Sequence, residues 1–340
     1  MGQTTKRTTI VDVGQRAGVS TKTVSRVFNH APNVSDEVRQ RVRQAAEELN
    51  YHPNVFAQAL VRRRSHLIGL LYDNPSPSYV INLQMGMIAR LQGERYRLIV
   101  VPVQAAGDSA EAIVGQLRAA ALDGVVIVPP MSDDARILDL LDSAGIRCAR
   151  VAPTRMLDRT PGTMMDDVAA AREIADHVVS LGHRDIAIIR GDPTHPSSHA
   201  RSRGYLAALD AAGLSVPQCR IAQGYYTVDS GIAAGRELLT GDDRPTAILA
   251  QNDDMAAGAL LAARERGLDV PGDLSVVGFD DSEVSHVTWP RITTIRQPVF
   301  DMAFASADML IADLEGRPID PLRMLPHELL LRGSTAPPRR

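Results

Sequence analysis

The sequence has few aromatic residues, few cysteines and no long hydrophobic run. Phe, Tyr and Trp make up 4% of its 340 residues, so its cores must be built from aliphatic and alanine side chains. Cys148 and Cys219 lie far apart and lack metal-ligand spacing, which argues against a disulfide framework and fits a reducing compartment. No stretch reaches the roughly 18 apolar residues that span a bilayer, and no signal peptide is evident. We therefore expect a soluble cytoplasmic protein without a membrane partner.

Motifs of common enzymes are absent as well. The chain has neither a Walker-type phosphate loop nor a G-x-S-x-G elbow. Acidic pairs such as Asp166-Asp167 are adjacent, and neighbours on a strand point to opposite faces. His195 and His199 have the i, i+4 spacing of helical metal ligands, but Pro196 disfavours a regular helix through His195 and no third ligand is nearby. We predict neither catalysis nor a metal site nor a cofactor.

Charge is unevenly distributed, although the net charge is only −3. Residues 1–64 contain 11 Lys and Arg against 5 Asp and Glu, whereas the remaining chain contains 26 against 35. Clustered cations favour contact with nucleic acid because they release counterions from its phosphates. A solvated basic terminus is the alternative explanation. The length suits two or three compact units.

Residues 9–29, TIVDVGQRAGVSTKTVSRVFN, have the pattern of two short helices joined by a turn. Gly18 interrupts the first helical pattern, and Ser20 can cap the second helix by accepting from its free backbone N–H groups. This arrangement predicts a helix-turn-helix. Its inward side chains would be Ile10, Val13, Ala17, Val19, Val24 and Val27.

The outward face of the second helix would carry hydrogen-bond donors. Lys22 and Arg26 are spaced i, i+4, so both can point into a major groove. Lys22 is also one of only two lysines in the chain. An ordinary helical hairpin with a polar face is the alternative. The outward set is Thr21, Lys22, Ser25, Arg26 and Asn29.

A third helix is expected after Ser35, which would cap it. The break Tyr51-His52-Pro53-Asn54 then precedes a short apolar segment, residues 55–60, and three arginines. A helix of this length is not stable alone in water. The segment therefore needs a partner.

Residues 8–65 resemble the head and hinge of the LacI/GalR family of regulators. The matching pieces are T-I-V-D-V, A-G-V-S, T-V-S-R-V, N-x-x-x-x-V-S, and Y-x-P-N followed by A-x-x-L. The resemblance implies that the second helix reads the major groove, and that residues 53–65 contain a hinge helix that folds on operator DNA. It also implies that Leu60 enters the central minor-groove step, where an apolar wedge unstacks the bases and bends the duplex. A core contact of Leu60 with the body is the alternative.

The predicted DNA contacts combine the pattern with the resemblance. Gly14 departs from the family's usual alanine and would slightly loosen the first helix, and Gln58 stands where arginine is frequent. The residues expected to contact DNA are Thr9, Ser20, Thr21, Lys22, Thr23, Ser25, Arg26, Asn29, Asn54, Ala57 and Leu60.

From residue 66 onward, strand and helix signals alternate. Amphipathic stretches of helical length, such as 109–121, 168–181 and 252–266, separate short apolar runs typical of strands buried on both faces. Repeated βα units predict parallel sheets covered by helices, with ligands at the carboxyl ends of the strands. The predicted strands are Leu67–Tyr72, Leu98–Val103, Val125–Val128, Ile186–Ile189, Ala247–Ala250 and Leu274–Phe279.

The body also resembles the LacI/GalR family, whose core is similar to periplasmic binding proteins. The matches include L-G-H-R-D-I-A, R-S-R-G-Y-L-A-A-L, N-D-D-M-A-A-G-A-L, L-S-V-V-G-F-D-D and T-T-I-R-Q-P. The fold class implied is an all-α helix-turn-helix head, residues 1–52, with an α/β two-lobed body, residues 66–340. Lobe N would comprise about 66–163 and 295–324, and lobe C about 164–292 and 325–335.

The resemblance places an effector site between the lobes. It implies contacts from Arg201, Asp280 and Asn252, because a guanidinium fork and a carboxylate can grip vicinal hydroxyls. Each has a structural alternative: a surface ion pair, a turn cap and a helix N-cap, respectively. Asp253 is expected to support the following helix N-terminus. The remaining predicted effector contacts are Asn74, Ser78 and Tyr79 in the first βα loop, and His199 just before Arg201.

Two further residues leave alternatives open. Trp289, the sole tryptophan, can stack on a sugar or be buried in a lobe. Many family members have aspartate where Ala152 stands, so no particular sugar can be transferred to this chain.

Together these features predict a homodimeric regulator, most simply a repressor, that binds near-palindromic operator DNA and releases it on binding a sugar. A purine or nucleoside effector is the alternative ligand. A solute receptor and an enzyme on the same core are the alternative functions. The C-terminus is expected to end in a strand and a disordered tail, without the heptads that join dimers into tetramers.

Overall fold

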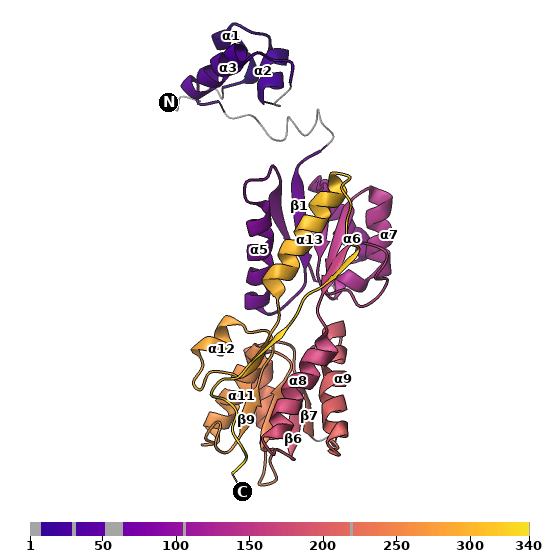
Figure 1. Cartoon of the computed structure of the whole chain (residues 1–340), viewed down its shortest axis with the longest axis vertical. Coiled ribbons are helices and arrows are strands. Elements are labelled where there is room, and N and C mark those ends of the chain that lie inside the picture. Colours follow the sequence, from indigo (N-terminus) through magenta and orange to yellow (C-terminus); the bar gives the residue numbers. More distant parts are fainter. Residues whose placement is uncertain (1–7, 29–31, 52–63, 105–106, 218–219, 340) are drawn as a thin grey trace. The chain divides into compact units, whose positions relative to one another are not determined.

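The protein is described from a computed structural model that covers residues 8–28, 32–51, 64–104, 107–217 and 220–339 (Figure 1). It divides into two compact units, residues 1–66 and 67–340. Asn29, Asn54, Ala57 and Leu60, four of the predicted DNA contacts, lie outside the described residues. Among the described residues, no helix combines the length and apolarity needed to cross a membrane.

The head contains three helices, α1 (Ile10–Ala17), α2 (Thr21–Phe28) and α3 (Asp36–Glu48). Thr9 and Asp12 form a capping box at the start of α1, and Gly18 ends it in the left-handed conformation with φ 64°. Ser20 caps α2 as predicted, since its Oγ accepts from the Thr23 N–H at 3.2 Å. Ser35 stands at the N-cap of α3 as predicted, but its side chain makes no capping hydrogen bond.

Gly14 has a packing reason that the sequence did not reveal. A Cβ at this position would lie 2.9 Å from the Val19 carbonyl oxygen, so α1 approaches the turn closely here. The head core packs around it and consists of Val13, Ala17, Val24, Val27, Val42, Ala45 and Ala46.

The first lobe is built on a six-stranded parallel sheet with the order β11-β5-β4-β3-β1-β2. Its strands are β1 (Leu67–Tyr72), β2 (Arg97–Pro102), β3 (Gly124–Ile127), β4 (Arg147–Val151), β5 (Gly162–Met164) and β11 (Leu322–Met324). Helices α5 (Pro77–Leu91) and α13 (Val299–Leu314) cover one face and share one core. Helices α6 (Ala110–Ala119) and α7 (Ala135–Ala144) cover the other.

The second lobe has a four-stranded parallel sheet with the order β7-β6-β8-β9. Its strands are β6 (Ile186–Arg190), β7 (Ile221–Gln223), β8 (Ala247–Ala250) and β9 (Ser275–Val277). Helices α8 (Asp167–Ser180) and α9 (Pro196–Ala211) pack on one face. Helices α10 (Val228–Leu238) and α11 (Asp253–Glu265) pack on the other, and the short α12 (Glu283–Val287) follows β9.

The chain passes between the lobes three times: after β5, after β10 (Thr294–Arg296), and between β11 and β12 (Glu328–Leu330). β10 and β12 pair antiparallel. The tail beyond β12 is ordered against the second lobe, which contradicts the predicted disordered end. Ser334 is fully buried and donates to the Val276 carbonyl, and Arg339 pairs with Asp269 at 2.8 Å.

Candidate functional site

A pocket lies between the lobes where strands of both sheets end, as parallel α/β sheets favour. We call it the central pocket. Its empty volume is about 450 Å³, partly open to solvent. The first lobe contributes Asn74, Ser76, Tyr79, Pro129 and Ala152, and the second contributes Asp167, His195, Ser197, Arg201, Tyr226, Asn252 and Asp280, with Gln297 following β10.

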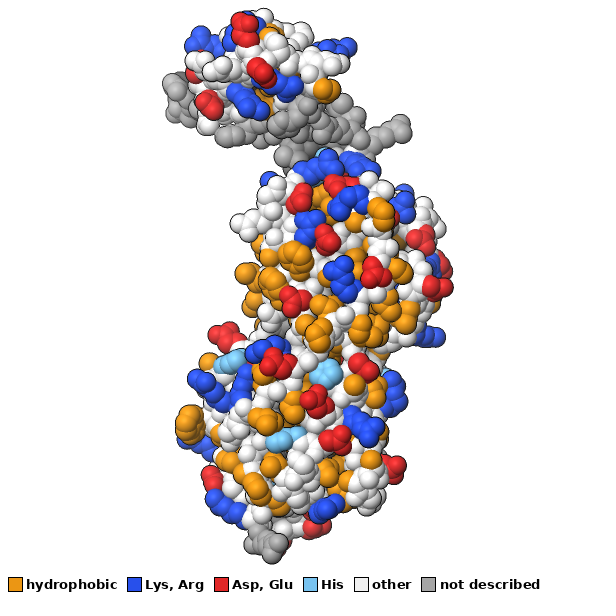
Figure 2. Space-filling view, in the orientation of Figure 1, with side chains coloured by type: hydrophobic (Ala, Val, Ile, Leu, Met, Phe, Trp, Pro, Cys, Tyr) orange, Lys and Arg blue, Asp and Glu red, His pale blue; other side chains and the backbone are white. Residues whose placement is uncertain are grey.

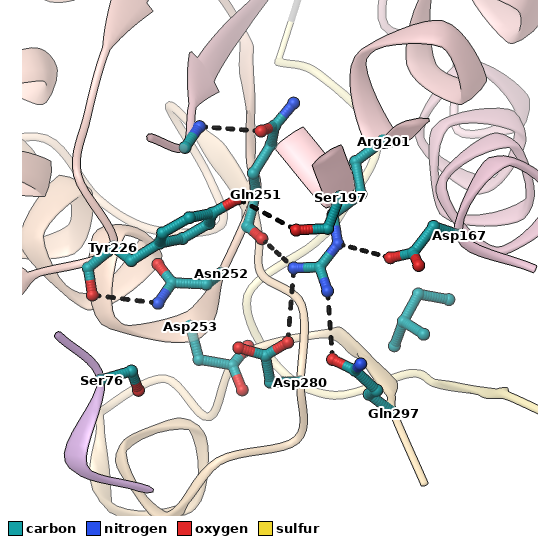
Figure 3. A network of polar contacts seen from close by, with 12 residues as sticks. Ser76, Asp167, Ser197, Arg201, Tyr226, Gln251, Asn252, Asp253, Asp280 and Gln297 are labelled. Carbon is teal, nitrogen blue, oxygen red and sulfur yellow. Dashed lines mark hydrogen bonds and ion pairs between the residues drawn. The ribbon is translucent and has the colours of Figure 1, made fainter. Parts of the chain in front are cut away.

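Arg201, on the second turn of α9, is the centre of the polar network in Figure 3. Its Nε donates to Asp167 at 2.9 Å, its Nη1 to the Gln251 carbonyl at 2.6 Å, and its Nη2 to Gln297 at 3.1 Å. The guanidinium lies 3.6 Å from the centroid of the Phe279 ring. Burial alone would lower the pKa of Arg201, but Asp280 and Asp167 raise it above its ordinary value. The side chain is therefore a fixed, permanently charged donor.

Asp280 follows β9 and points at Arg201, with 3.4 Å between its Oδ1 and Arg201 Nη1. Its φ of 110° is rare for a residue with a side chain, and its N–H donates to the Ile295 carbonyl at 2.8 Å. Burial raises the pKa of Asp280 to about 7, against the lowering effect of Arg201. Its carboxyl therefore changes charge near neutral pH.

Asn252 combines the two roles that the sequence left open. Its Oδ1 caps α11 by accepting from the Met255 N–H at 2.9 Å, and its Nδ2 donates to the Tyr226 carbonyl at 3.2 Å. The side chain also lines the central pocket. Structurally it is a helix cap, and its position still allows ligand contact.

Asp253 lies in the first turn of α11, as expected, and its carboxylate has further partners as well. Its carboxylate accepts from the Ser282 N–H at 2.7 Å and from Thr294 Oγ1 at 2.6 Å. Burial raises the pKa of Asp253 well above its ordinary value. The residue therefore ties the loop after β9 to the crossover strand β10, directly behind Asp280.

The first βα loop contacts the opposite lobe. Ser76, which is buried, donates from its Oγ to Asp254 Oδ2 at 2.7 Å, and Asn74 Oδ1 accepts from the Ser76 N–H at 2.9 Å. Burial raises the pKa of Tyr79, which also lines the central pocket. This loop thus both lines the pocket and hydrogen-bonds across it.

Two predicted effector residues do not line the central pocket. Ser78 does not line the central pocket, and Ser76 of the same loop lines it instead. His199 lies on the other side of α9, where its Nε2 bonds to the Pro193 carbonyl at 3.0 Å. His199 and Arg201 are two residues apart on a helix, hence about 200° apart around its axis. The helical period could therefore have shown, from the sequence alone, that His199 and Arg201 do not line the same pocket.

Several lining residues were missed by the sequence analysis. Asp167 begins α8, Tyr226 follows β7, and Gln297 falls within the T-T-I-R-Q-P motif without having been assigned a role. His195 is not among the missed residues, because its position shortly before Arg201 favours a place in the cleft wall, and it lines the pocket. It stands at the N-cap of α9, edge-on to the Tyr226 ring with centroids 5.4 Å apart. Burial lowers the pKa of His195, which favours the neutral imidazole. Its neighbour Ser197 lies 3.4 Å from the Tyr226 hydroxyl.

Trp289 lies neither in the central pocket nor in a core. It is 93% exposed and borders a shallow pocket with Arg291 and Arg332. Both alternatives considered for it, sugar stacking and burial in a lobe, are therefore wrong for the single chain.

The head presents the predicted polar face on α2. Thr21, Lys22 and Arg26 are exposed, and neither Lys22 nor Arg26 forms an ion pair with a described residue. By contrast, Arg16 on α1 is paired with Glu48. Thr9 and Ser20 serve as helix caps, and Thr23 and Ser25 are half-buried. The two cations of α2 are therefore available to a partner.

Comparison with known proteins adds two family matches. Residues 9–54 match the family described as "Bacterial regulatory proteins, lacI family", and residues 175–335 match a "Periplasmic binding protein-like domain". Catabolite control protein A of Priestia megaterium is 31% identical over 329 residues, covering 96% of this chain and 99% of that protein.

Two solved structures resemble the chain over almost its whole length. The lac repressor dimer bound to operator and the anti-inducer ONPF superimposes with a TM-score of 0.85 at 31% identity, covering 97% of this chain and 100% of that one. A complex of the transcriptional regulator CelR with cellobiose gives a TM-score of 0.73 at 29% identity, covering 96% and 100%.

Proposed function

The chain belongs to the LacI family of bacterial regulatory proteins, and from this premise we propose that it is a repressor released from operator DNA by a sugar bound in the central pocket. As a family member it is a transcriptional regulator with a ligand-binding domain. A repressor acts where the chromosome is, so we place its action in the cytoplasm. The observation that carries the proposal is the fixed Arg201 between Asp167 and Asp280.

The central pocket fits a ligand rich in hydroxyl groups. Of the five N–H groups of a guanidinium, Arg201 uses four on Asp167, Gln251, Asp280 and Gln297, so one remains for a ligand oxygen. Carboxylates accept several hydrogen bonds each, so Asp167 and Asp280 can also accept from ligand hydroxyls. Since a hydroxyl both donates and accepts, vicinal hydroxyls satisfy both kinds of group. CelR, a structural relative, was solved with cellobiose.

A purine or nucleoside is the alternative effector. Tyr79, Tyr226 and His195 all line the central pocket, so it contains more aromatic surface than the composition suggested. Planar bases stack on such rings, whereas sugars place an apolar C–H face against them. Aromatic lining therefore keeps both ligand classes open, and the hydroxyl-binding arginine and carboxylates favour the sugar.

DNA binding would use the polar face of α2. Lys22 and Arg26 are exposed and unpaired among the described residues, as side chains that enter a major groove must be. The lac repressor, similar over 97% of this chain, was solved on its operator as a dimer. We infer the same role for the predicted set in the head, including the four contacts outside the described residues.

We infer a homodimer from the exposed apolar surface of the body. Ile81, Met85 and Ile88 follow one face of α5 and are 57%, 52% and 49% exposed. Phe300 and Phe304 on the adjacent α13 are also exposed, and hydrophobic side chains gather over α5 in Figure 2. Contiguous apolar surface of this kind usually marks an interface. A second copy would cover it and place two heads on two operator half-sites.

Selection of bound duplexes from a random DNA pool, followed by sequencing, tests the proposal. We expect a near-palindrome with a deformable central step. Sugars and nucleosides are then added singly to the selected duplex, and we expect a sugar to release it. Recovery of no sequence from folded, dimeric protein would contradict operator recognition. Release by nucleosides alone would replace the sugar with the alternative effector.

A further inference from the structure

A second pocket lies on the outer side of α9, at the carboxyl ends of β6 and β7. We call it the α9 pocket. It has an empty volume of about 800 Å³ and opens to solvent. One face of α9 provides Ser198, His199, Ser202, Arg203 and Leu206, and the strand ends provide Arg190, Gly191, Pro193 and Gln223. None of these residues lines the central pocket.

The α9 pocket is cationic and, among the described residues, has no acidic residue in its wall. Arg190 and Arg203 both face it, and neither forms an ion pair with a described residue. Among the other arginines of this lobe, Arg236 does pair, with Glu265 at 2.7 Å. The nearest acid in sequence, Asp192, accepts from Thr194 and borders a different pocket. Two arginines converge here without a counter-charge.

The side chains of His199 and Ser202 in the α9 pocket bear on how an anion could be bound there. His199 Nε2 is bonded to a carbonyl, which only accepts, so this nitrogen carries the proton. Ser202 Oγ accepts from Gln251 Nε2 at 2.7 Å, so the Ser202 hydroxyl proton can be donated to a ligand.

We propose that the α9 pocket binds the phosphate group of a small metabolite, held by Arg190 and Arg203 with Ser202 as a further donor. Arginine forks match the oxygens of phosphate and bind them with charge-assisted hydrogen bonds. This site is distinct from the effector site and does not depend on the identity of the effector.

Gln251 connects the two pockets. Its side-chain Nε2 donates to Ser202 in the wall of the α9 pocket, its Oε1 accepts from the Gly191 N–H at 2.7 Å, and its backbone carbonyl accepts from Arg201. Gln251 is fully buried. Ser202 is therefore two hydrogen bonds away from Arg201, through Gln251. We expect phosphate binding at Ser202 to change the ligand affinity of the central pocket.

The test is calorimetric titration of the full-length protein with inorganic phosphate at constant ionic strength, alongside Arg190→Gln, Arg203→Gln and the double variant. Arg118→Gln is the matched control, because Arg118 is an exposed arginine on α6 without a described ion pair. A charged hydrogen bond contributes enough that each single variant should weaken phosphate binding roughly tenfold or more. The double variant should abolish it, and the control should bind like the unchanged protein.

Absence of saturable binding at millimolar phosphate would overturn the site. Equal loss in Arg118→Gln would do so as well, because it would attribute binding to overall charge. Circular dichroism spectra and melting temperatures of all variants establish that each is folded. The selected operator binds through the head, not through the α9 pocket. Arginine variants that lose phosphate but still bind this DNA therefore leave the proposed function intact, and loss of DNA binding by the unchanged protein would contradict that function and not the α9 site.

Discussion

Replacement of Asp280 by asparagine should change how stability depends on pH. Burial raises the pKa of Asp280 from its ordinary value of 3.8 to about 7. Between these values the folded protein holds a proton that the unfolded chain has lost, so ionisation of Asp280 costs stability as pH rises. Each pH unit in this range lowers the free energy of unfolding by about 1.4 kcal/mol. From pH 5 to pH 8 the cost amounts to roughly 2.5 kcal/mol.

The Asp280→Asn variant lacks this proton, so its free energy of unfolding should fall less between pH 5 and pH 8 than that of the unchanged protein, by roughly 2.5 kcal/mol. Only the difference in slope is predicted, because the variant also removes a partner of Arg201. Urea titrations at several pH values, followed by circular dichroism, measure it. Trp289 is 93% exposed, so its fluorescence is a poor reporter of unfolding.

Asp158→Asn is the control, since Asp158 is an exposed carboxylate in the other lobe. Its stability curve should run parallel to that of the unchanged protein. If the curves of Asp280→Asn and the unchanged protein are also parallel from pH 5 to pH 8, Asp280 titrates like an ordinary carboxyl. The argument from burial would then be refuted.

Three further substitutions probe the head, the dimer and the first lobe. Lys22→Gln should weaken operator binding in filter-binding assays. If Lys22 contacts a phosphate, the slope of log affinity against log salt should also fall by about one. An unchanged affinity would show that Lys22 is not in the DNA interface. Met85→Glu places a charge on the exposed face of α5 and should shift the protein to monomers in sedimentation, whereas a persistent dimer would place the interface elsewhere. Arg150 is fully buried and donates to the Ser132 and Arg155 carbonyls. Arg150→Met leaves these acceptors unpaired and should lower the free energy of unfolding, measured in urea, by about 3 kcal/mol. A loss near zero would show that methionine packing compensates.

Long buried strands and strongly patterned helices could be predicted from the sequence. β1 and β8 have the predicted bounds, because four to six consecutive apolar residues between turn signals are typical of strands buried on both faces. β5, β7, β10, β11 and β12 were missed as individual strands or bounded poorly, since each has only three residues. A three-residue strand has little periodicity of its own, and β9, also of three residues, was predicted because it lies within the longer apolar run 274–279.

The candidate site was predictable only where a motif carried it. Arg201, Asp280 and Asn252 were found through motifs, and the structure brings them together with Asn74 and Tyr79. Ser76 and Asp167 depend on how the two lobes meet, which no local pattern encodes. The prediction of a disordered C-terminal tail was wrong for a related reason. Its Pro/Arg composition is typical of disorder, but Ser334 and Arg339 bind partners on the second lobe.

Because the chain passes between the lobes three times, each lobe can finish folding only after a late part of the chain has been synthesised. The head core ends near Tyr51, so a nascent chain can finish its head early. The first lobe must wait for α13 and β11, which supply one helix of its cover and one edge of its sheet. The second lobe must wait for β12 and Ser334. A ribosome that stops between Tyr51 and β11 releases a chain with a complete helical head and two unfinished lobes, whereas a stop between β11 and β12 leaves only the second lobe unfinished.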